Sequence, residues 1–226
     1  MKSSKANRSV KWTALMIIGI ALPAALARAD IIVNQFNTVT GTTEVGQWRF
    51  DFGGAAHSAT FDPTLDANNN PLSGSMRVDL TFSLGLGGDS KGAYTTDRWY
   101  PGLDGSTLGT LQFDLRIDPS SALDAFGNNG YFSIAIRNTD NYNYINQFGD
   151  NVRIADGWRH VSVPLTGPYD HIRALTWQLY GGPSQNINGD VILNIDNIKF
   201  TEVPEPSALA LLGLAALGTR AIRRRL

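Results

Sequence analysis

The sequence predicts an all-β fold, an antiparallel β-sandwich, for the central part of this 226-residue chain. Two observations lead to this class. Short runs such as Met76 to Phe82 alternate apolar and polar residues, which is typical of strands with one buried face. Clusters rich in Gly, Asn, Asp and Pro, such as Asn128 to Gly130, separate these runs and indicate turns. No segment of the central part has the pattern of a long helix.

Six runs follow the alternating pattern in chain order. They are residues 76–82, 111–117, 131–137, 161–165, 175–180 and 191–195. The apolar members of each run are expected to face inward, between two sheets. The predicted core therefore includes Leu115, Ile134, Val163, Trp177 and Leu193, together with Trp48 and Trp158. The polar neighbours, Thr176 among them, are expected on the outer faces, where truncation to alanine should cost little stability.

The first 29 residues have the three parts of a secretory signal peptide. Met1 to Lys11 is basic and contains no acid, and Trp12 to Leu26 is apolar. Ala27-Arg28-Ala29 is a small-x-small cleavage site. We therefore expect export, removal of residues 1–29 by signal peptidase, and a mature chain that begins near Asp30.

The C-terminal residues 203–226 also have three parts in a fixed order. A Pro-Glu-Pro triplet precedes a short apolar run and an arginine cluster; the residues concerned are Pro204, Glu205, Pro206, Arg223, Arg224 and Arg225. This order resembles the PEP-CTERM sorting signal of Gram-negative bacteria. The resemblance implies transient anchoring in the inner membrane by a short hydrophobic helix, then cleavage by an exosortase. It also implies delivery to the cell surface, the outer membrane or the extracellular exopolysaccharide matrix.

An ordinary C-terminal membrane anchor is the alternative interpretation of this tail. The apolar run has only about a dozen residues, which span ~18 Å as a helix, whereas the hydrocarbon core of a bilayer is ~30 Å thick. The length of the run therefore argues against a permanent anchor.

The domain between the two ends, residues 30–202, is acidic. Nine of the 19 basic residues and one of the 20 acidic residues lie in the ends, which leaves 10 and 19 in the domain and a net charge near −9. Such a surface repels nucleic acid and anionic lipid, and it suits neutral sugars or divalent cations.

No catalytic residues are predicted. The chain has no cysteine, so thiol chemistry is excluded. His57, His160 and His171 have no metal-ligand spacing, and no Gly-x-Ser-x-Gly elbow occurs. We expect a non-catalytic protein, with a glycan-cleaving enzyme as the less favoured alternative.

Several motifs of the domain resemble a known fold family. Gly157-Trp158 opens a run that ends in Pro164, and Asp196-Asn197-Ile198 follows the last run. These features are similar to the galactose-binding-like jelly rolls used by many carbohydrate-binding modules. The resemblance implies a jelly-roll β-sandwich. It leaves two functions open: binding of a polysaccharide, or a structural surface component that has protein partners and binds no sugar.

Aromatic and polar residues on the outward phase of the strands, and in neighbouring loops, form a candidate glycan-binding surface. Rings stack on sugar faces, while amides and charged groups bind hydroxyls. The candidates are Trp99, Tyr100, Tyr131, Arg137, Tyr142, Tyr144, Gln178 and Tyr180, with Arg116 on the same expected sheet. The alternative is that these are ordinary solvent-facing residues and loop-packing aromatics.

A structural calcium ion is the one cofactor that the resemblance suggests. Asp196 in the last strand is the leading ligand, and Asn34, Glu44 and Asp51 are the further candidates. Calcium takes six to eight oxygen ligands, so one aspartate does not define a site. Asn37 stands where the family commonly has an acid. The stretch Asp66 to Asn70 imitates the start of an EF-hand loop but is expected to be a turn, because Pro71 replaces the required glycine.

Overall fold

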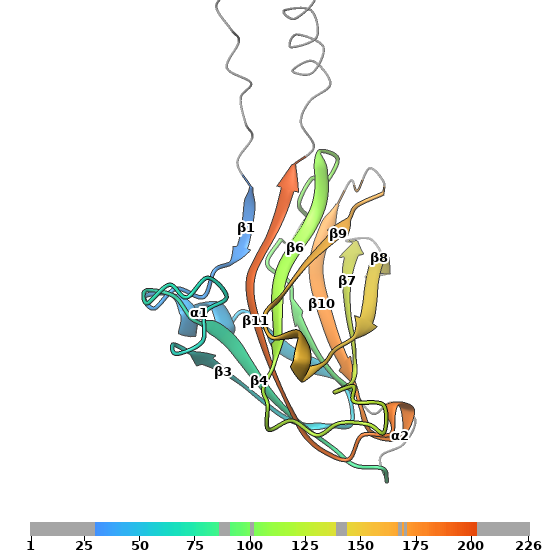
Figure 1. Cartoon of the computed structure of the whole chain (residues 1–226). Coiled ribbons are helices and arrows are strands. Elements are labelled where there is room, and N and C mark those ends of the chain that lie inside the picture. Colours follow the sequence, from blue (N-terminus) through green and yellow to red (C-terminus); the bar gives the residue numbers. More distant parts are fainter. Residues whose placement is uncertain are drawn as a thin grey trace, which may run out of the picture. The chain divides into compact units, whose positions relative to one another are not determined.

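The computed structural model describes residues 30–85, 91–99, 102–138, 144–166, 169 and 171–202. The eleven strands of this part form two antiparallel sheets that pack face to face (Figure 1). The predicted antiparallel jelly-roll β-sandwich is therefore confirmed.

Each sheet mixes strands from distant parts of the sequence. The six-stranded sheet has the order β3 (Ala56–Asp62), β4 (Ser75–Phe82), β11 (Gly189–Glu202), β6 (Leu108–Ile117) and β9 (Arg159–Pro164), and β1 (Ile31–Asn34) also pairs with β11. The five-stranded sheet has the order β2 (Arg49–Phe52), β5 (Lys91–Thr96), β10 (Ile172–Tyr180), β7 (Tyr131–Asn138) and β8 (Tyr144–Asn151). The helices of the described part are short: α1 (Gly41–Val45), α2 (Gly182–Gln185) and the 3₁₀ turn η1 (Ile154–Asp156).

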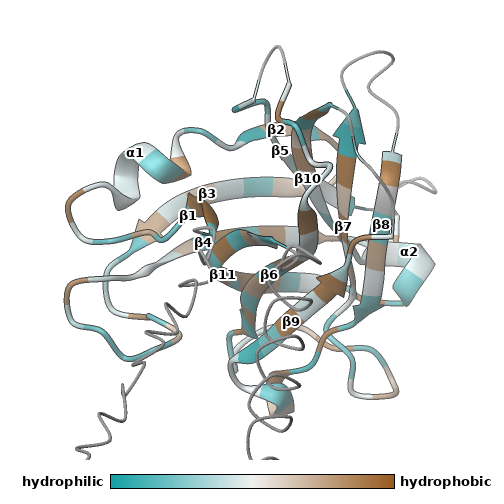
Figure 2. Ribbon diagram, turned by 90° about the horizontal axis from the view of Figure 1, so that it is seen from above, coloured by the Kyte–Doolittle hydropathy of each residue, from teal (hydrophilic) through white to brown (hydrophobic). Residues whose placement is uncertain are grey.

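The core lies between the sheets and follows the predicted alternation. All six predicted runs lie within or overlap strands, and Figure 2 shows hydrophobic residues spread along both sheets. The predicted core residues Leu115, Ile134, Val163, Trp177, Leu193 and Trp48 are all buried. The Trp177 ring stacks on that of Tyr94 with centroids 4.9 Å apart, and the Phe132 ring lies 6.2 Å away. Large aromatic rings therefore fill the centre of the sandwich.

Two predictions about the core are wrong. Thr176 lies on the outer face, as predicted, but it is not the exposed, tolerant residue that was expected: it is fully buried and its hydroxyl lies 2.7 Å from that of Thr95. Its side chain points to the outer face of the five-stranded sheet, where other side chains cover it. Trp158 was expected in the core, but it is only half-buried, since it lies in the segment before β9 and lines a surface groove.

The last strand is longer than its alternating run predicts, because a bulge changes its phase. Val191, Leu193 and Ile195 face the core, and then Ile198 and Phe200 do so. The register shifts between Asp196 and Lys199, and Asn197 has a φ of 50°. Asn is one of the few residues that tolerate this left-handed conformation. The bulge lets β11 continue to Glu202 while Asn197 points outward.

The two ends of the chain that were assigned from sequence lie outside the described residues. These are the signal peptide at residues 1–29, and the sorting tail at residues 203–226 with its expected helix. Within the described ranges, none of the helices has the length and apolar character needed to cross a membrane.

Candidate functional site

The outer face of the five-stranded sheet gathers residues from β7, β8 and β10 into one layer. Tyr180 pairs with Tyr131 across β10 and β7, and Gln178 pairs with Ser133. Arg137 pairs with Tyr144 across β7 and β8. Because Trp177 and Leu179 face the core, Gln178 and Tyr180 must point to the opposite side. The strand register therefore brings these side chains together on one outer surface.

A continuous chain of hydrogen bonds links this layer, and we call its members the network face: Asp51, Arg137, Tyr144, Gln178 and Tyr180. The Tyr180 hydroxyl donates to Gln178 Oε1 at 2.6 Å. Gln178 Nε2 and Arg137 Nη2 both donate to the Tyr144 hydroxyl at 2.9 Å. Arg137 Nη2 also lies 3.4 Å from Asp51 Oδ2. The Tyr144 hydroxyl is thus the centre of a chain of polar groups that runs from β10 to β2.

Threonines extend the network face beneath its aromatic rim. The Thr95 hydroxyl donates to Asp51 Oδ2 at 2.9 Å and lies 2.7 Å from the Thr176 hydroxyl. Arg49 also donates to Asp51, at 2.8 Å. Arg49 also pairs with Asp97 at 3.1 Å, so two arginines face the two carboxylates of Asp51 and Asp97, and the charges at this end of the face are locally balanced.

Aromatic rings frame the network face and leave part of their surface open. The rings of Tyr131 and Tyr180 meet edge to face with centroids 6.1 Å apart, and Lys91 Nζ lies 5.1 Å from the Tyr180 ring. The Arg137 guanidinium lies 4.6 Å from the Tyr144 ring. Tyr131 is 36% exposed and Tyr144 44%, whereas Gln178 is only 3% exposed. The polar groups are thus held in place at depth, and the rings are accessible.

Five of the predicted glycan-binding residues come together here: Tyr131, Arg137, Tyr144, Gln178 and Tyr180. Tyr144 was expected in a loop but belongs to β8, which the sequence hides because the strand is polar. Tyr100 and Tyr142 lie outside the described residues. Sequence reasoning missed Thr95 and assigned Asp51 to a metal site. The alternation of Arg49-Phe50-Asp51-Phe52 is the signal that would have placed Asp51 in a strand.

Two expected members of this surface lie elsewhere. The Trp99 ring packs against Phe200 with centroids 5.7 Å apart, so it covers the core instead of the network face. Arg116 belongs to β6 and therefore to the other sheet. The outward phase of Arg116 was inferred correctly, but sequence alternation does not say which of two sheets a strand joins. Trp99 was expected in a loop, where alternation gives no direction.

The predicted calcium ligands do not form one set. Asn34 accepts a hydrogen bond from the Trp48 indole at 2.9 Å. The Glu44 carboxylate accepts the backbone N–H groups of Gln35 and Phe36, so it fixes the turn after β1. Asp51 belongs to the network face. Three of the four candidates thus serve other contacts, and the predicted four-residue site does not fit a calcium ion.

Asp196 lies at the bulge of β11, and it is fully buried. Its carboxylate accepts the N–H groups of Ala67 at 3.0 Å and Asn197 at 2.7 Å. Burial raises the pKa of Asp196 to about 7, and the neighbouring Asp66 carboxyl adds to the rise. In the described ranges no group of three or more His, Cys, Asp or Glu side chains is placed to hold a metal. Calcium binding at Asp196 therefore remains a prediction.

The loop from Asp66 to Asn70 is a turn, as predicted. Asp66 Oδ1 accepts the backbone N–H groups of Asn68 at 2.8 Å and Asn70 at 2.7 Å. These bonds fold the loop over the bulge of β11 and bury Asp196.

Comparison with known proteins identifies the C-terminal segment and the fold. The PEP-CTERM protein-sorting motif matches residues 202–225. A search of curated protein sequences finds no match to the chain.

Solved structures resemble the domain in fold. One is a carbohydrate-binding module specific for non-crystalline cellulose (CBM28), with a TM-score of 0.55 and 12% identity over 77% of this chain and 96% of the module. Another is an arabinose-bound α-L-arabinofuranosidase (GH51), with a TM-score of 0.53 and 13% identity over 76% of this chain. This chain spans only 26% of that enzyme's length. The PEP-CTERM motif implies recognition by an exosortase, export, and a surface or extracellular location. The chain is therefore a β-sandwich with the fold of carbohydrate-binding modules, and it carries a PEP-CTERM sorting motif at residues 202–225.

Proposed function

We propose that this protein is an exported, non-catalytic component of the cell surface or exopolysaccharide matrix that binds a neutral polysaccharide through its network face. The observation that carries the proposal is the hydrogen-bond chain Tyr180–Gln178–Tyr144–Arg137, framed by accessible tyrosine rings. Sugars present hydroxyls at their edges and C–H groups on their faces. A layer of fixed donors and acceptors beside open rings suits both parts.

The charge of the domain favours a neutral ligand. The net charge near −9 repels anionic polymers, while the charges within the face are largely paired: Asp51 lies beside Arg49 and Arg137. Binding should therefore depend little on salt, because few counterions are released. A network that is already assembled also lowers the entropic cost of binding.

The route to the surface forms part of the proposal. Signal peptidase removes residues 1–29, the tail anchors the protein transiently in the inner membrane, and an exosortase then cleaves at the sorting motif. The fold of a cellulose-specific module supports binding of a polysaccharide, and the sorting motif supports placement where such polymers occur.

A glycan array followed by calorimetric titration tests the binding. Tyr131→Ala removes an accessible ring, and it should weaken binding about tenfold, or 1.4 kcal/mol, with an unchanged melting temperature. Phe126→Ala is the matched control, because Phe126 is an 88% exposed aromatic outside the network face. Failure of both the array and a pull-down with the producing cell's own polysaccharide would reject the proposal. A structural component with protein partners would then be the better interpretation.

A further inference from the structure

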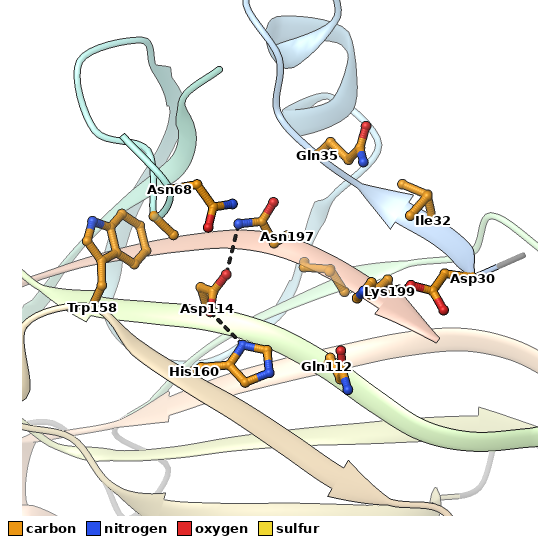
Figure 3. Close-up of a pocket in the computed structure, with 12 residues that line it drawn as sticks. Asp30, Ile32, Gln35, Asn68, Gln112, Asp114, Trp158, His160, Asn197 and Lys199 are labelled. Atoms are coloured by element: carbon orange, nitrogen blue, oxygen red, sulfur yellow. Dashed lines mark hydrogen bonds and ion pairs between the residues drawn. The ribbon is translucent and has the colours of Figure 1, made fainter. Parts of the chain in front are cut away.

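A polar groove lies on the side of the sandwich opposite the network face, on the outer face of the six-stranded sheet. It has a volume of about 600 Å³, which is in the range of small-ligand sites. Its walls come from β1, the 66–70 loop, β6, the segment before β9 and the bulge of β11 (Figure 3). It shares no lining residue with the network face.

A fixed polar cluster forms the floor of this groove. Asp114 Oδ1 lies 2.8 Å from His160 Nδ1, and Asp114 Oδ2 accepts a hydrogen bond from Asn197 Nδ2 at 2.8 Å (Figure 3). The positive φ of Asn197 in the bulge turns its side chain towards Asp114. The position of each group is thus set by a neighbour before any ligand arrives.

Three further carboxamides line the groove and are available to a ligand. Among the described residues, the side chains of Gln35, Asn68 and Gln112 have no hydrogen-bond partner, although all three border the groove. Each carboxamide can donate and accept. The half-buried Trp158 indole lies in the same wall, beside Asn68 in Figure 3. Unpaired amides next to an aromatic ring match the hydroxyls and the apolar face of a sugar.

The charges in the walls argue for a neutral ligand. Lys199 Nζ lies 2.6 Å from Asp30 Oδ2, so the two charges at one end of the groove compensate each other. At the other end the charge of Asp114 is shared with His160 and Asn197. With His160 neutral, Asp114 leaves the lining a formal charge of −1, so the groove offers hydrogen bonds and a ring but no excess of positive charge that would select an anionic ligand.

We infer that this groove is a second saccharide-binding site, specific for a neutral oligosaccharide or a segment of a polysaccharide. Its bridging role rests on the proposed function of the network face. With sites on the outer faces of two opposed sheets, one domain holds two glycan chains at once and cross-links them. A linker of this kind would strengthen a matrix without any contact between protein copies, since each domain joins two chains.

The test uses the whole chain in a detergent without a sugar headgroup, titrated with cellohexaose, xylohexaose, mannohexaose and the producing cell's polysaccharide. The groove is removed by the double variant Asn68→Ala/Gln112→Ala and, independently, by Trp158→Ala. The double variant truncates amides that have no hydrogen-bond partner among the described residues, and it should fold normally. Asn188→Ala, an exposed amide outside the groove, is the control. The network face is disabled by Tyr131→Ala.

The wild-type protein should bind two oligosaccharides and raise the light scattering of dissolved polysaccharide. Groove variants should bind one oligosaccharide fewer and should no longer raise the light scattering of the polysaccharide. The Asn188→Ala control should behave like the wild-type protein in both measurements. If Tyr131→Ala abolishes all binding and the groove variants change nothing, the second site is rejected and the proposed function stands. If the groove variants abolish all binding, the groove stands and the network face is rejected. Absence of binding to every probe rejects both.

Discussion

The buried carboxyl of Asp196 should make the stability of the domain fall as pH rises through the acidic range. Its pKa is about 7 in the folded protein and near 3.8 when solvated. Between these values the native state holds a proton that the unfolded state has released. Since stability rises with pH only where the unfolded state binds more protons, the free energy of unfolding must decrease across this window.

The size of the effect follows from the shift. One pKa unit corresponds to about 1.4 kcal/mol. A shift of about three units therefore lowers the free energy of unfolding by ~4 kcal/mol between pH 4 and pH 7. The contribution is fully present below the unfolded pKa and is lost above the folded pKa. Carboxyls whose pKa is lowered in the folded state, such as Asp118 and Asp150, act in the opposite direction but below about pH 4. The slope between pH 5 and pH 6 should therefore belong to Asp196.

Urea unfolding followed by tryptophan fluorescence at pH 5, 6, 7 and 8, with a chelator present, measures this slope. Asp196→Asn should flatten it, because the amide does not titrate. At pH 5 the variant should be less stable by about 1–3 kcal/mol, since asparagine has one acceptor oxygen for two N–H groups. Asp190→Asn changes an exposed carboxyl on the same strand and should keep the wild-type slope. A wild-type stability that is constant or rises from pH 5 to pH 7 would refute the reasoning.

Three further predictions concern the core, the ion and the tail. Trp177→Ala should lower the free energy of unfolding in urea by about 3–5 kcal/mol, because it is a large-to-small change in a packed core. Thr176→Ala should lower it by about 1–2 kcal/mol, because the buried Thr95 hydroxyl loses one hydrogen-bond partner. Equal losses would mean that Trp177 is not the centre of packing. Calcium in hundredfold excess over its dissociation constant should stabilise the wild-type protein by about 2.7 kcal/mol relative to a chelator. A melting temperature that does not change would contradict calcium binding, and an equal response in Asp196→Asn would place the ion away from Asp196. Replacing Pro204, Glu205 and Pro206 by alanine should leave uncleaved protein in the inner membrane; intact mass spectrometry of surface protein that still carries Arg223 to Arg225 would contradict exosortase processing.

The sequence predicts strands well where one face of a sheet is apolar and the other polar. β4, β6 and β9 obey this rule, since their inner residues alternate with outer polar ones. β5 and β8 do not. Lys91 to Thr96 is buried on both faces, and Tyr144 to Asn151 has polar residues at an edge of the sheet. In β5 the burial of both faces comes from the neighbouring elements, and in β8 the edge position leaves the described residues exposed or half-buried, so in both strands periodicity carries no signal.

The candidate sites were predictable only in part, for a related reason. Alternation gave the outward phase of Gln178 and Tyr180 correctly, and strand pairing then placed them beside Tyr131. It did not give the sheet to which Arg116 belongs, nor the place of Trp99 against Phe200. The groove on the other sheet depends on the bulge at Asn197, which shifts the phase within one strand. Register shifts and sheet membership are properties of the assembled fold.

The buried polar residues of the network face allow a test of whether the network serves ligand binding or only the stability of the fold. Gln178 and Thr176 are polar side chains held away from water on the outer side of a sheet. Burying such groups brings little net stability, and well-packed apolar side chains of similar size often replace them at no cost. Gln178→Leu should therefore leave the melting temperature equal or higher, because leucine fills the buried position and the Tyr144 hydroxyl still accepts a hydrogen bond from Arg137. It should weaken binding of the polysaccharide at least tenfold, since the chain from Tyr180 to Arg137 is interrupted. Loss of more than about 2 kcal/mol in unfolding free energy with unchanged binding would show that the network serves the fold.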